Sequence, residues 1–312
     1  MSNINIKRLV ENIRSGTNVY TPLVELVVNA IQAIDERKSG EGLVEIQIKR
    51  DGQEDLIEGV RGVDGFIVSD NGIGFTQNNR DAFDTVYTEK KIADGGKGFG
   101  RFTCLKYFDK MAVRSIFLDG ETPKQRSFLM GLDTDIIVQE ELETVEAGDT
   151  GSTVEISGIK SVKFPDKRID TISKAIVERL LPYFVDADKP CPRVVIRDEG
   201  AAVPPVSLND YLGKENSQIV EMPIEDNSFT LSSNGEDKEF HVRVFKFYSP
   251  RAARSKISLV AHRREVTEVM LQSYVPEFAD EFFEPSPREE EGKGRNFVIK
   301  AYVFGDYLNE NV

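Results

Sequence analysis

The order of hydrophobic and polar residues predicts a chain of mixed helices and strands. Residues 22–38 and 172–184 repeat their apolar side chains with helical spacing, which is typical of helices that pack on a core. Residues 7–14 and 102–108 are shorter runs that we also expect to be helical.

Short apolar or alternating runs predict the strands. These runs are residues 44–50, 65–70, 111–117, 127–133, 151–159, 192–198, 241–248, 256–266 and 296–304. Residues 200–216, richer in proline and glycine, are the expected linker, and residues 277–294 are expected to form an acidic exposed loop. The pattern predicts an α+β fold in two units, residues 1–214 and a smaller α+β unit of residues 215–312.

Composition narrows the class of protein. The chain has 312 residues, of which 39% are hydrophobic, enough for packed cores. No apolar run reaches the roughly 18–20 residues of a membrane span, and the start does not resemble a signal peptide, so we expect a cytosolic protein without a membrane partner. Cys104, Cys191, His241 and His262 are too few for a disulfide framework or a Cys- or His-rich metal centre.

Charge leaves two interpretations of one segment. The formal net charge of −13 argues against nonspecific nucleic-acid binding, which depends on neutralising phosphates. Residues 240–264 nevertheless contain seven Lys and Arg residues and no acid. They are either a patch that contacts DNA or a solvated strand pair whose charge is balanced elsewhere.

The helix at residues 22–38 carries a polar stripe. Thr21 and Pro22 are typical of an N-cap and a first helical residue. Glu25, Asn29 and Gln32 lie at positions i, i+4 and i+7 and share one face of an otherwise apolar helix. Because unpaired burial of a polar group costs about 1–3 kcal/mol, this face meets either solvent or a polar pocket.

The run Asp70-Asn71-Gly72-Ile73-Gly74-Phe75 puts an acid at the end of an expected strand. A carboxylate only accepts hydrogen bonds, which suits an exocyclic amine such as that of adenine, and glycines let a ligand approach the backbone. An ordinary Asn-Gly turn explains the same residues.

A glycine-rich loop and a Gly-x-Thr strand follow. In Gly95-Gly96-Lys97-Gly98-Phe99-Gly100-Arg101, backbone amides before a helix together with two cations are suited to phosphate, although a flexible surface loop has the same composition. The spacing fits neither a P-loop nor a Rossmann fingerprint. Thr153, in the strand at 151–159, is a possible ligand contact, yet threonine is commonplace in strands.

The four features occur in the order found in the GHKL ATPases, the family of DNA gyrase, the ninety-kilodalton heat-shock chaperones, histidine kinases, MutL and the related MORC proteins. Glu25 and Asn29 resemble the E-x-x-x-N box, DNGIGF the D-x-G-x-G box, GGKGFG the glycine box that closes the lid, and GSTVEI the final G-T-x-V box. The resemblance covers about residues 1–200. It implies a Bergerat-type α/β sandwich followed by a transducer-like domain.

The resemblance also implies roles. Glu25 would be the general base or the group that positions water, Asn29 would hold Mg²⁺, and Asp70 would bind the adenine amine of ATP with support from Thr153. Residues 77–100 would form a lid. The other residues that it implies at the nucleotide are Gln32, Gly72, Ile73, Gly74, Gly96, Lys97, Gly98, Phe99, Gly100 and Arg101, with Lys256 as a sensor of the γ-phosphate.

Three functions remain open. A hydrolytic ATPase that closes its lid and clamps as a nucleotide-dependent homodimer is favoured by Glu25, because kinase members usually have asparagine there. A histidine kinase would carry a phosphoacceptor region before its ATP-binding part, and this chain has only about 20 residues there. Gln32 stands where many relatives carry aspartate, so a module that binds ATP without hydrolysing it is the third possibility. The client is DNA, as for MutL, gyrase and MORC, or protein, as for the chaperones, and we expect DNA-linked or defence-type biology. The chain ends just after an expected strand, so we expect a fragment of a longer protein.

Overall fold

The computed structural model describes residues 6–11, 13, 17–37, 40–54, 60–85, 100–160, 166–186, 189–199, 204–213, 217–233, 235–250, 254–285 and 294–311. The chain folds as two compact units. Met1–Leu180 and Cys191–Asn209 form the first, and Leu181–Pro190 and Asp210–Val312 form the second. Both contain helices and sheets, so the predicted α+β class is confirmed.

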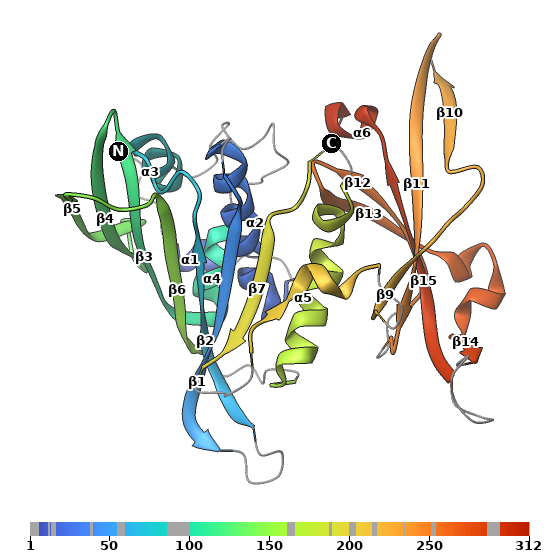
Figure 1. Ribbon diagram of the computed structural model, residues 1–312, viewed down its shortest axis with the longest axis horizontal. Coiled ribbons are helices and arrows are strands. Elements are labelled where there is room, and N and C mark those ends of the chain that lie inside the picture. The colour runs from blue at the N-terminus through green and yellow to red at the C-terminus, as the bar shows by residue number, and fades with distance from the viewer. Residues whose placement is uncertain are drawn as a thin grey trace. The chain divides into compact units, whose positions relative to one another are not determined.

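An eight-stranded sheet with the order β5-β4-β3-β6-β2-β1-β7-β8 forms the first unit (Figure 1). Its strands are β1 (Leu43–Glu54), β2 (Arg61–Asp70), β3 (Phe108–Asp119), β4 (Thr122–Met130), β5 (Ile137–Thr144), β6 (Gly151–Ile159), β7 (Arg193–Asp198) and β8 (Val206–Ser207). Neighbours are antiparallel except β1 and β7, which are parallel. Strand β2 is therefore an interior strand, and Asp70 lies at its end.

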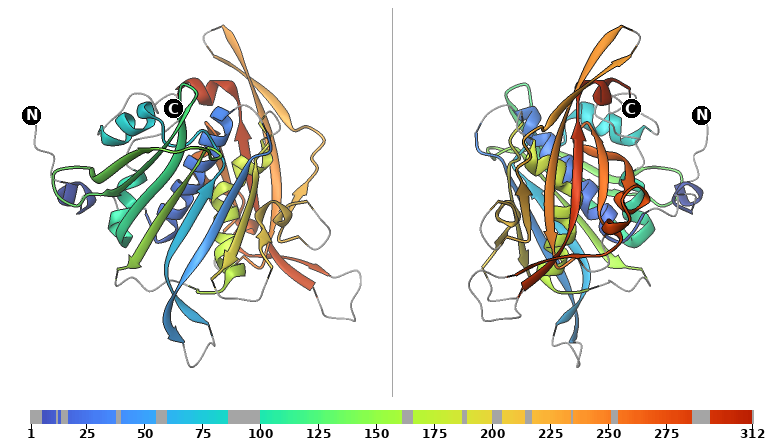
Figure 2. Two further views of the ribbon diagram at one scale, coloured as in Figure 1. Left: turned by 60° about the vertical axis from the view of Figure 1, so that its left-hand side comes forward. Right: turned by 90° about the vertical axis from the view of Figure 1, so that its right-hand side faces the viewer.

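Helices cover one face of this sheet (Figure 2). They are α1 (Ile6–Glu11), α2 (Tyr20–Arg37), α3 (Gln77–Asp84), α4 (Gly100–Tyr107) and α5 (Ile169–Val185). Val44, Ile46 and Ile48 of β1 are fully buried while the residues between them are half-buried, as expected for a sheet with one covered face. Helix α2 packs on β1, β2 and β6, and α4 packs on α2 and β3.

The start of α2 differs from the prediction. The Asn18 side chain accepts a hydrogen bond from the Tyr20 amide at 3.0 Å, and the Asn18 amide donates to the Thr21 hydroxyl oxygen at 3.0 Å. This reciprocal arrangement is a capping box, so Asn18 is the cap and Thr21 is its partner. Pro22 lies within the first turn, where its missing N–H costs little.

The second unit contains a seven-stranded sheet, the end of α5 and the short helix α6. Its strands are β9 (Ile219–Met222), β10 (Ser228–Ser233), β11 (Glu236–Tyr248), β12 (Lys256–Ala261), β13 (Arg264–Met270), β14 (Phe282–Pro285) and β15 (Gly294–Phe304). The main order is β10-β11-β15-β12-β13, with β9 on β11 and β14 on β15. Helix α6 (Asp306–Asn311) packs on β11 and β12 through Leu308, around which Phe240, Ala261 and Val303 are buried.

Three expected segments have different structures. Residues 256–266 are two strands joined by a turn, in which His262 and Arg263 have φ of 48° and 60°. The expected linker 200–216 contains β8, which pairs with β7, and the 3₁₀-helix η2 (Leu208–Tyr211). The expected acidic loop 277–294 contains strand β14 and the end of the 3₁₀-helix η4 (Pro276–Ala279), and its residues 286–293 lie outside the described residues. A further 3₁₀-helix, η3 (Leu271–Ser273), follows β13.

Candidate functional site

One face of helix α2 contacts two glycines, Gly72 and Gly100, that are far apart in the sequence. Glu25, Asn29 and Ala33 follow one another at intervals of four residues on this face. At one end Glu25 lies against Gly100, the first residue of α4, and at the other end Ala33 lies against Gly72 in the turn after β2. Eight residue steps separate Glu25 from Ala33, which corresponds to about 12 Å of helix. Asn29 lies between them, and Gln32 is half-buried on the same side.

The contact between Glu25 and Gly100 is so close that a side chain at residue 100 would require the Glu25 side chain to move. A β-carbon added there would lie 2.8 Å from Cδ of Glu25. Beneath this contact, burial and the charge of Glu25 raise the pKa of the Cys104 thiol to about 12. Cys104 therefore stays a neutral thiol at neutral pH.

The carboxyl of Asp70 is held at the end of β2. Burial raises its pKa to about 6, while hydrogen bonds from the backbone of Gly72 and Ser152 and the charge of Arg37 act in the opposite direction. The Gly72 amide donates to Oδ1 of Asp70 at 2.8 Å. Arg37 donates to the Asn71 carbonyl oxygen at 2.6 Å and ties the end of α2 to this turn. A partly desolvated carboxylate of this kind is a strong acceptor for a ligand amine.

The two glycines after Asp70 are required by packing. A β-carbon at Gly72 would lie 2.7 Å from the Ala33 β-carbon, and the Ile73 amide donates to the Ala33 carbonyl oxygen at 3.1 Å. Gly74 has φ +77°, and a β-carbon there would lie 2.9 Å from the carbonyl carbon of Ile116. The turn is thus fixed between α2 and β3, which holds Asp70 in place.

The register of β2 and β6 distinguishes Ser152 from Thr153. Asp70 pairs with Ser152, whereas Thr153 pairs with Ser69, and their hydroxyls lie 3.0 Å apart. Since adjacent residues of a strand face opposite sides of the sheet, Ser152 shares the face of Asp70 and Thr153 does not. Sequence reasoning missed Ser152. The signal was the strand alternation, but it identifies the residue only once the register with β2 is known.

Arg101 joins α4 to α3. It donates to the Thr85 carbonyl oxygen at 2.9 Å, and its guanidinium lies over the rings of Phe83 at 5.2 Å and Phe102 at 4.8 Å. Burial lowers its pKa to about 10, which still leaves it charged at neutral pH. The predicted phosphate ligands Gly96, Lys97, Gly98 and Phe99 lie outside the described residues.

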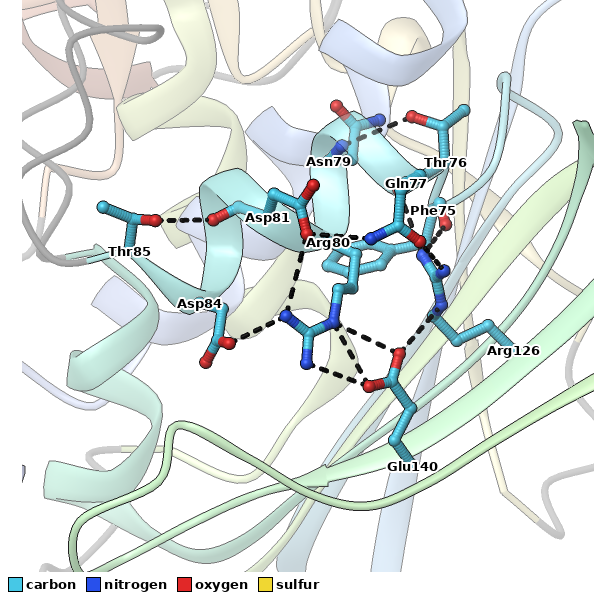
Figure 3. A network of polar contacts seen from close by, with 10 residues as sticks. All are labelled: Phe75, Thr76, Gln77, Asn79, Arg80, Asp81, Asp84, Thr85, Arg126 and Glu140. Carbon is cyan, nitrogen blue, oxygen red and sulfur yellow. Dashed lines mark hydrogen bonds and ion pairs between the residues drawn. The ribbon is translucent and has the colours of Figure 1, made fainter.

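A network around Arg126 fixes the chain just after the Asp70 turn (Figure 3). The Arg126 side chain is only 1% exposed. It donates to the carbonyl oxygens of Phe75 at 2.9 Å and Thr76 at 3.1 Å, and to the Gln77 side chain at 2.6 Å. Its Nε lies 3.1 Å from Glu140, which also binds Arg80 of α3 at 3.0 Å. Strands β4 and β5 thereby hold the first turn of α3.

Four of the seven cations of residues 240–264 have acidic partners, and Arg251 lies outside the described residues. Arg243 pairs with Glu221 at 2.5 Å, Lys246 with Glu284 at 3.1 Å, and Arg263 with Asp186 at 3.0 Å. Lys256 binds Glu265 at 2.5 Å and Glu268 at 2.7 Å. These contacts match the second of the two interpretations of the segment, in which its charge is balanced by acids from elsewhere in the chain.

Within the described residues, no group of three or more His, Cys, Asp and Glu side chains is arranged to hold a metal ion. No described helix combines the length and the apolar character needed to cross a membrane.

Comparison with known proteins gives one family and one fold. Residues 17–157 match the family described as "Histidine kinase-, DNA gyrase B-, and HSP90-like ATPase". Among solved structures, the fold is similar to one named "Crystal Structure of N terminal domain of a DNA repair protein", with a TM-score of 0.51 and 12% identity over 95% of this chain and 86% of that chain. At this identity the likeness concerns the fold alone. No curated protein matches the sequence.

Proposed function

We propose that the first unit of this chain, whose residues 17–157 match the histidine kinase-, DNA gyrase B- and HSP90-like ATPases, binds ATP along helix α2 and hydrolyses it. The observation that carries the proposal is the face of α2 that runs from Ala33, against the Asp70 turn, to Glu25, against Gly100. A nucleotide lying along this face has its base at Asp70 and its phosphates at Glu25.

At the base end, Asp70 accepts a hydrogen bond from the adenine amine. The rigid turn supports this role, because Gly72 and Gly74 are packed against α2 and β3 and cannot shift when the ligand arrives. Ser152, on the same face as Asp70, is the better candidate for the supporting hydroxyl. Thr153 stays a prediction from the resemblance; its hydroxyl contacts that of Ser69, just as the Ser152 hydroxyl contacts that of Ser115.

At the phosphate end, Glu25 accepts a proton from the attacking water or orients it. The Asn29 side-chain oxygen, one turn further along the helix, is a hard ligand of the kind that Mg²⁺ prefers. When bound, the ion neutralises charge on the phosphates. Among the described residues, Asn29 would supply one oxygen ligand to Mg²⁺, and phosphate and water oxygens would supply the others.

We also propose roles for the lid segment, for Gln32 and for Lys256. The segment from α3 to the start of α4 acts as the lid, and its closure over ATP promotes a homodimer. Gln32 is uncharged and serves as a hydrogen-bonding group near the phosphates. For Lys256 to sense the γ-phosphate, its ion pairs with Glu265 and Glu268 have to open, so its role is the least supported.

We propose a DNA-linked process as the one that hydrolysis drives, with a protein client as the alternative. The fold likeness supports this proposal, whereas the ion pairs of residues 240–264 weaken it, because paired cations release fewer counterions from DNA. DNA binding measured over a range of salt concentrations tests it. A steep loss with salt that Arg254→Glu flattens supports the proposal, and no binding at low salt contradicts it.

The hydrolysis proposal is tested at Glu25. We expect Glu25→Ala and Glu25→Gln to bind ATP with near wild-type affinity and to lose turnover by about 100-fold or more, the usual contribution of a general base. Glu36→Gln, an exposed residue of the same helix, is the matched control. Wild-type turnover in Glu25→Gln would remove Glu25 from this role, and wild-type protein that binds ATP without turnover would indicate a nucleotide-gated module.

A further inference from the structure

Strand β10 is an edge strand without charge. It has the sequence SFTLSS and, among the described residues, pairs with β11 alone. Phe229 and Leu231 on this strand are 42% and 55% exposed. The hairpin of β10 and β11 extends past the neighbouring strands of its sheet (Figure 1). An edge of this kind presents unpaired backbone groups to any other strand, and natural edges usually carry charge or proline to prevent such pairing.

The other edges of the two sheets are protected. Strand β5 carries Glu140, Glu141 and Glu143, and strand β13 carries Arg264, Glu265 and Glu268. Strand β8 has only two residues. Within the described residues, β10 is therefore unlike the edge strands β5, β8 and β13, which are protected by charge or by their short length. This difference indicates that the edge of β10 has a partner.

The hydrogen bonding to β11 fixes which residues of β10 face outward. The Val242 amide donates to the Asn227 carbonyl oxygen at 2.6 Å, which makes this a hydrogen-bonded pair, and every second pair along the hairpin is of the same kind. Phe229 and Leu231 thus direct their backbone groups to β11. Ser228, Thr230 and Ser232 direct theirs to the open side.

We propose that the open edge of β10 pairs antiparallel with β10 of a second copy, about a two-fold axis at Thr230. In this register Thr230 meets Thr230 of the second copy, and Ser228 meets Ser232, which together give about six backbone hydrogen bonds. Phe229 lies opposite Leu231 of the second copy. These are the non-hydrogen-bonded positions, where side chains approach most closely, so both exposed apolar side chains gain a cross-strand partner.

The strand sequence favours a copy of itself over an unrelated peptide. A two-fold axis at Thr230 is the one that places Phe229 of each copy opposite Leu231 of the other. Such a contact is isologous, because the same surface of both copies forms it. The chain carries a net charge of −13, so two copies repel each other in general, while β10 adds no charge to the contact. Added salt screens this repulsion and strengthens the dimer.

The test measures the mass of the full chain without nucleotide. Sedimentation velocity over a range of concentrations should show a monomer–dimer equilibrium that higher salt shifts toward dimer. Thr230→Lys places two ammonium groups opposite each other on the axis and should weaken the dimer by about tenfold or more. Val269→Lys, at a similarly exposed site on β13, is the matched control and should leave the equilibrium unchanged, with circular dichroism to verify that both variants fold.

Cross-linking gives a second measurement. Thr230→Cys, made together with Cys191→Ser because Cys191 is only half-buried, should form a covalent dimer with a short bismaleimide. Val269→Cys with the same second change, and the Cys191→Ser parent, whose remaining Cys104 is buried, should form much less. A monomer at every concentration, or a dimer that Thr230→Lys does not weaken, overturns the proposal. Because nucleotide is absent, neither result bears on the ATP-dependent dimer proposed above.

Discussion

Gly100 and Glu25 are in such close contact that a methyl group at residue 100 would displace the Glu25 side chain: a β-carbon there would lie 2.8 Å from Cδ of Glu25. The first residue of α4 therefore sets the position of the proposed catalytic carboxylate on α2. The contact joins the end of the proposed lid to the group that would activate water.

Gly100→Ala is expected to displace Glu25 and to reduce turnover by about 10–100-fold, since a misplacement of about 1 Å can have an effect of this size. ATP affinity should change much less, because Asp70 lies at the other end of the helix face. Steady-state kinetics together with calorimetric binding measure both quantities. Gly52→Ala, where a β-carbon meets nothing within 4 Å, is the control. Equal effects in the two variants would refute this role for the contact.

ATP affinity is expected to fall as the pH drops below about 6, because the Asp70 carboxyl, whose pKa is raised to about 6, becomes protonated and stops accepting the adenine amine. Asp70→Asn should lower the affinity at pH 7 by about 1–3 kcal/mol and abolish the contribution of Asp70 to the pH dependence. The difference between wild type and variant, measured by calorimetry from pH 5 to 8, isolates this contribution from the titration of ATP itself.

The effect on stability has the opposite sign. The pKa of Asp70 is higher in the folded protein than its ordinary value of 3.8, so the folded state binds the proton more tightly. The stability that Asp70 contributes is complete below about pH 4 and is lost as the pH rises through about 6. Urea unfolding of wild type and Asp70→Asn over this range checks the sign, and a stability difference that does not change with pH would contradict the burial of this carboxyl.

Ser152→Ala is expected to weaken ATP binding by about 0.5–1.5 kcal/mol, the usual net value of one hydrogen bond. Thr153→Ala should change it by less, because Thr153 lies on the opposite face of the sheet from Asp70. The pair forms an internal control, since both variants remove one hydroxyl from the same strand. A larger effect at Thr153 would favour the residue that the sequence resemblance indicates.

Arg126→Met is expected to destabilise the protein by about 1–3 kcal/mol, since it leaves the carbonyl oxygens of Phe75 and Thr76 without their buried donor. Denaturant unfolding measures this loss. Glu140→Gln should cost less, because Glu140 is 28% exposed and its amide keeps an acceptor for Arg80. If both variants unfold like wild type, the network does not anchor α3.

The elements that the sequence predicts well are those with one buried face. Helix α2 and strand β1 alternate buried and partly exposed residues with the expected periods. Helix α3 has no buried residue and strand β5 is mostly exposed, so neither has an apolar stripe to reveal it. The turn between β12 and β13 uses His262 and Arg263 in left-handed backbone conformations, where glycine or asparagine would have been the usual signal.

In the candidate site, too, some residues have a local sequence signal and others do not. Glu25, Asn29 and Asp70 could be found because each belongs to a local motif. Ser152 and the contact of Glu25 with Gly100 depend on which strand and which helix become neighbours, and that information is spread over the whole unit. Arg126 gives no signal either, because an isolated arginine in a strand does not indicate that it is buried among carbonyl oxygens.

The parallel pairing of β7 with β1 determines how this protein can be dissected. Strand β7 belongs to the first unit, yet Leu181–Pro190, just before it in the chain, belongs to the second. A chain shortened after Ile159 keeps the whole stretch that matches the family but loses β7, so that β1, from Leu43 to Ile48, keeps only one of its two neighbouring strands. A second unit begun at Asp210 likewise loses Asp186, the partner of Arg263. No single cut yields two intact halves, so biochemical work on either unit has to start from the undivided polypeptide.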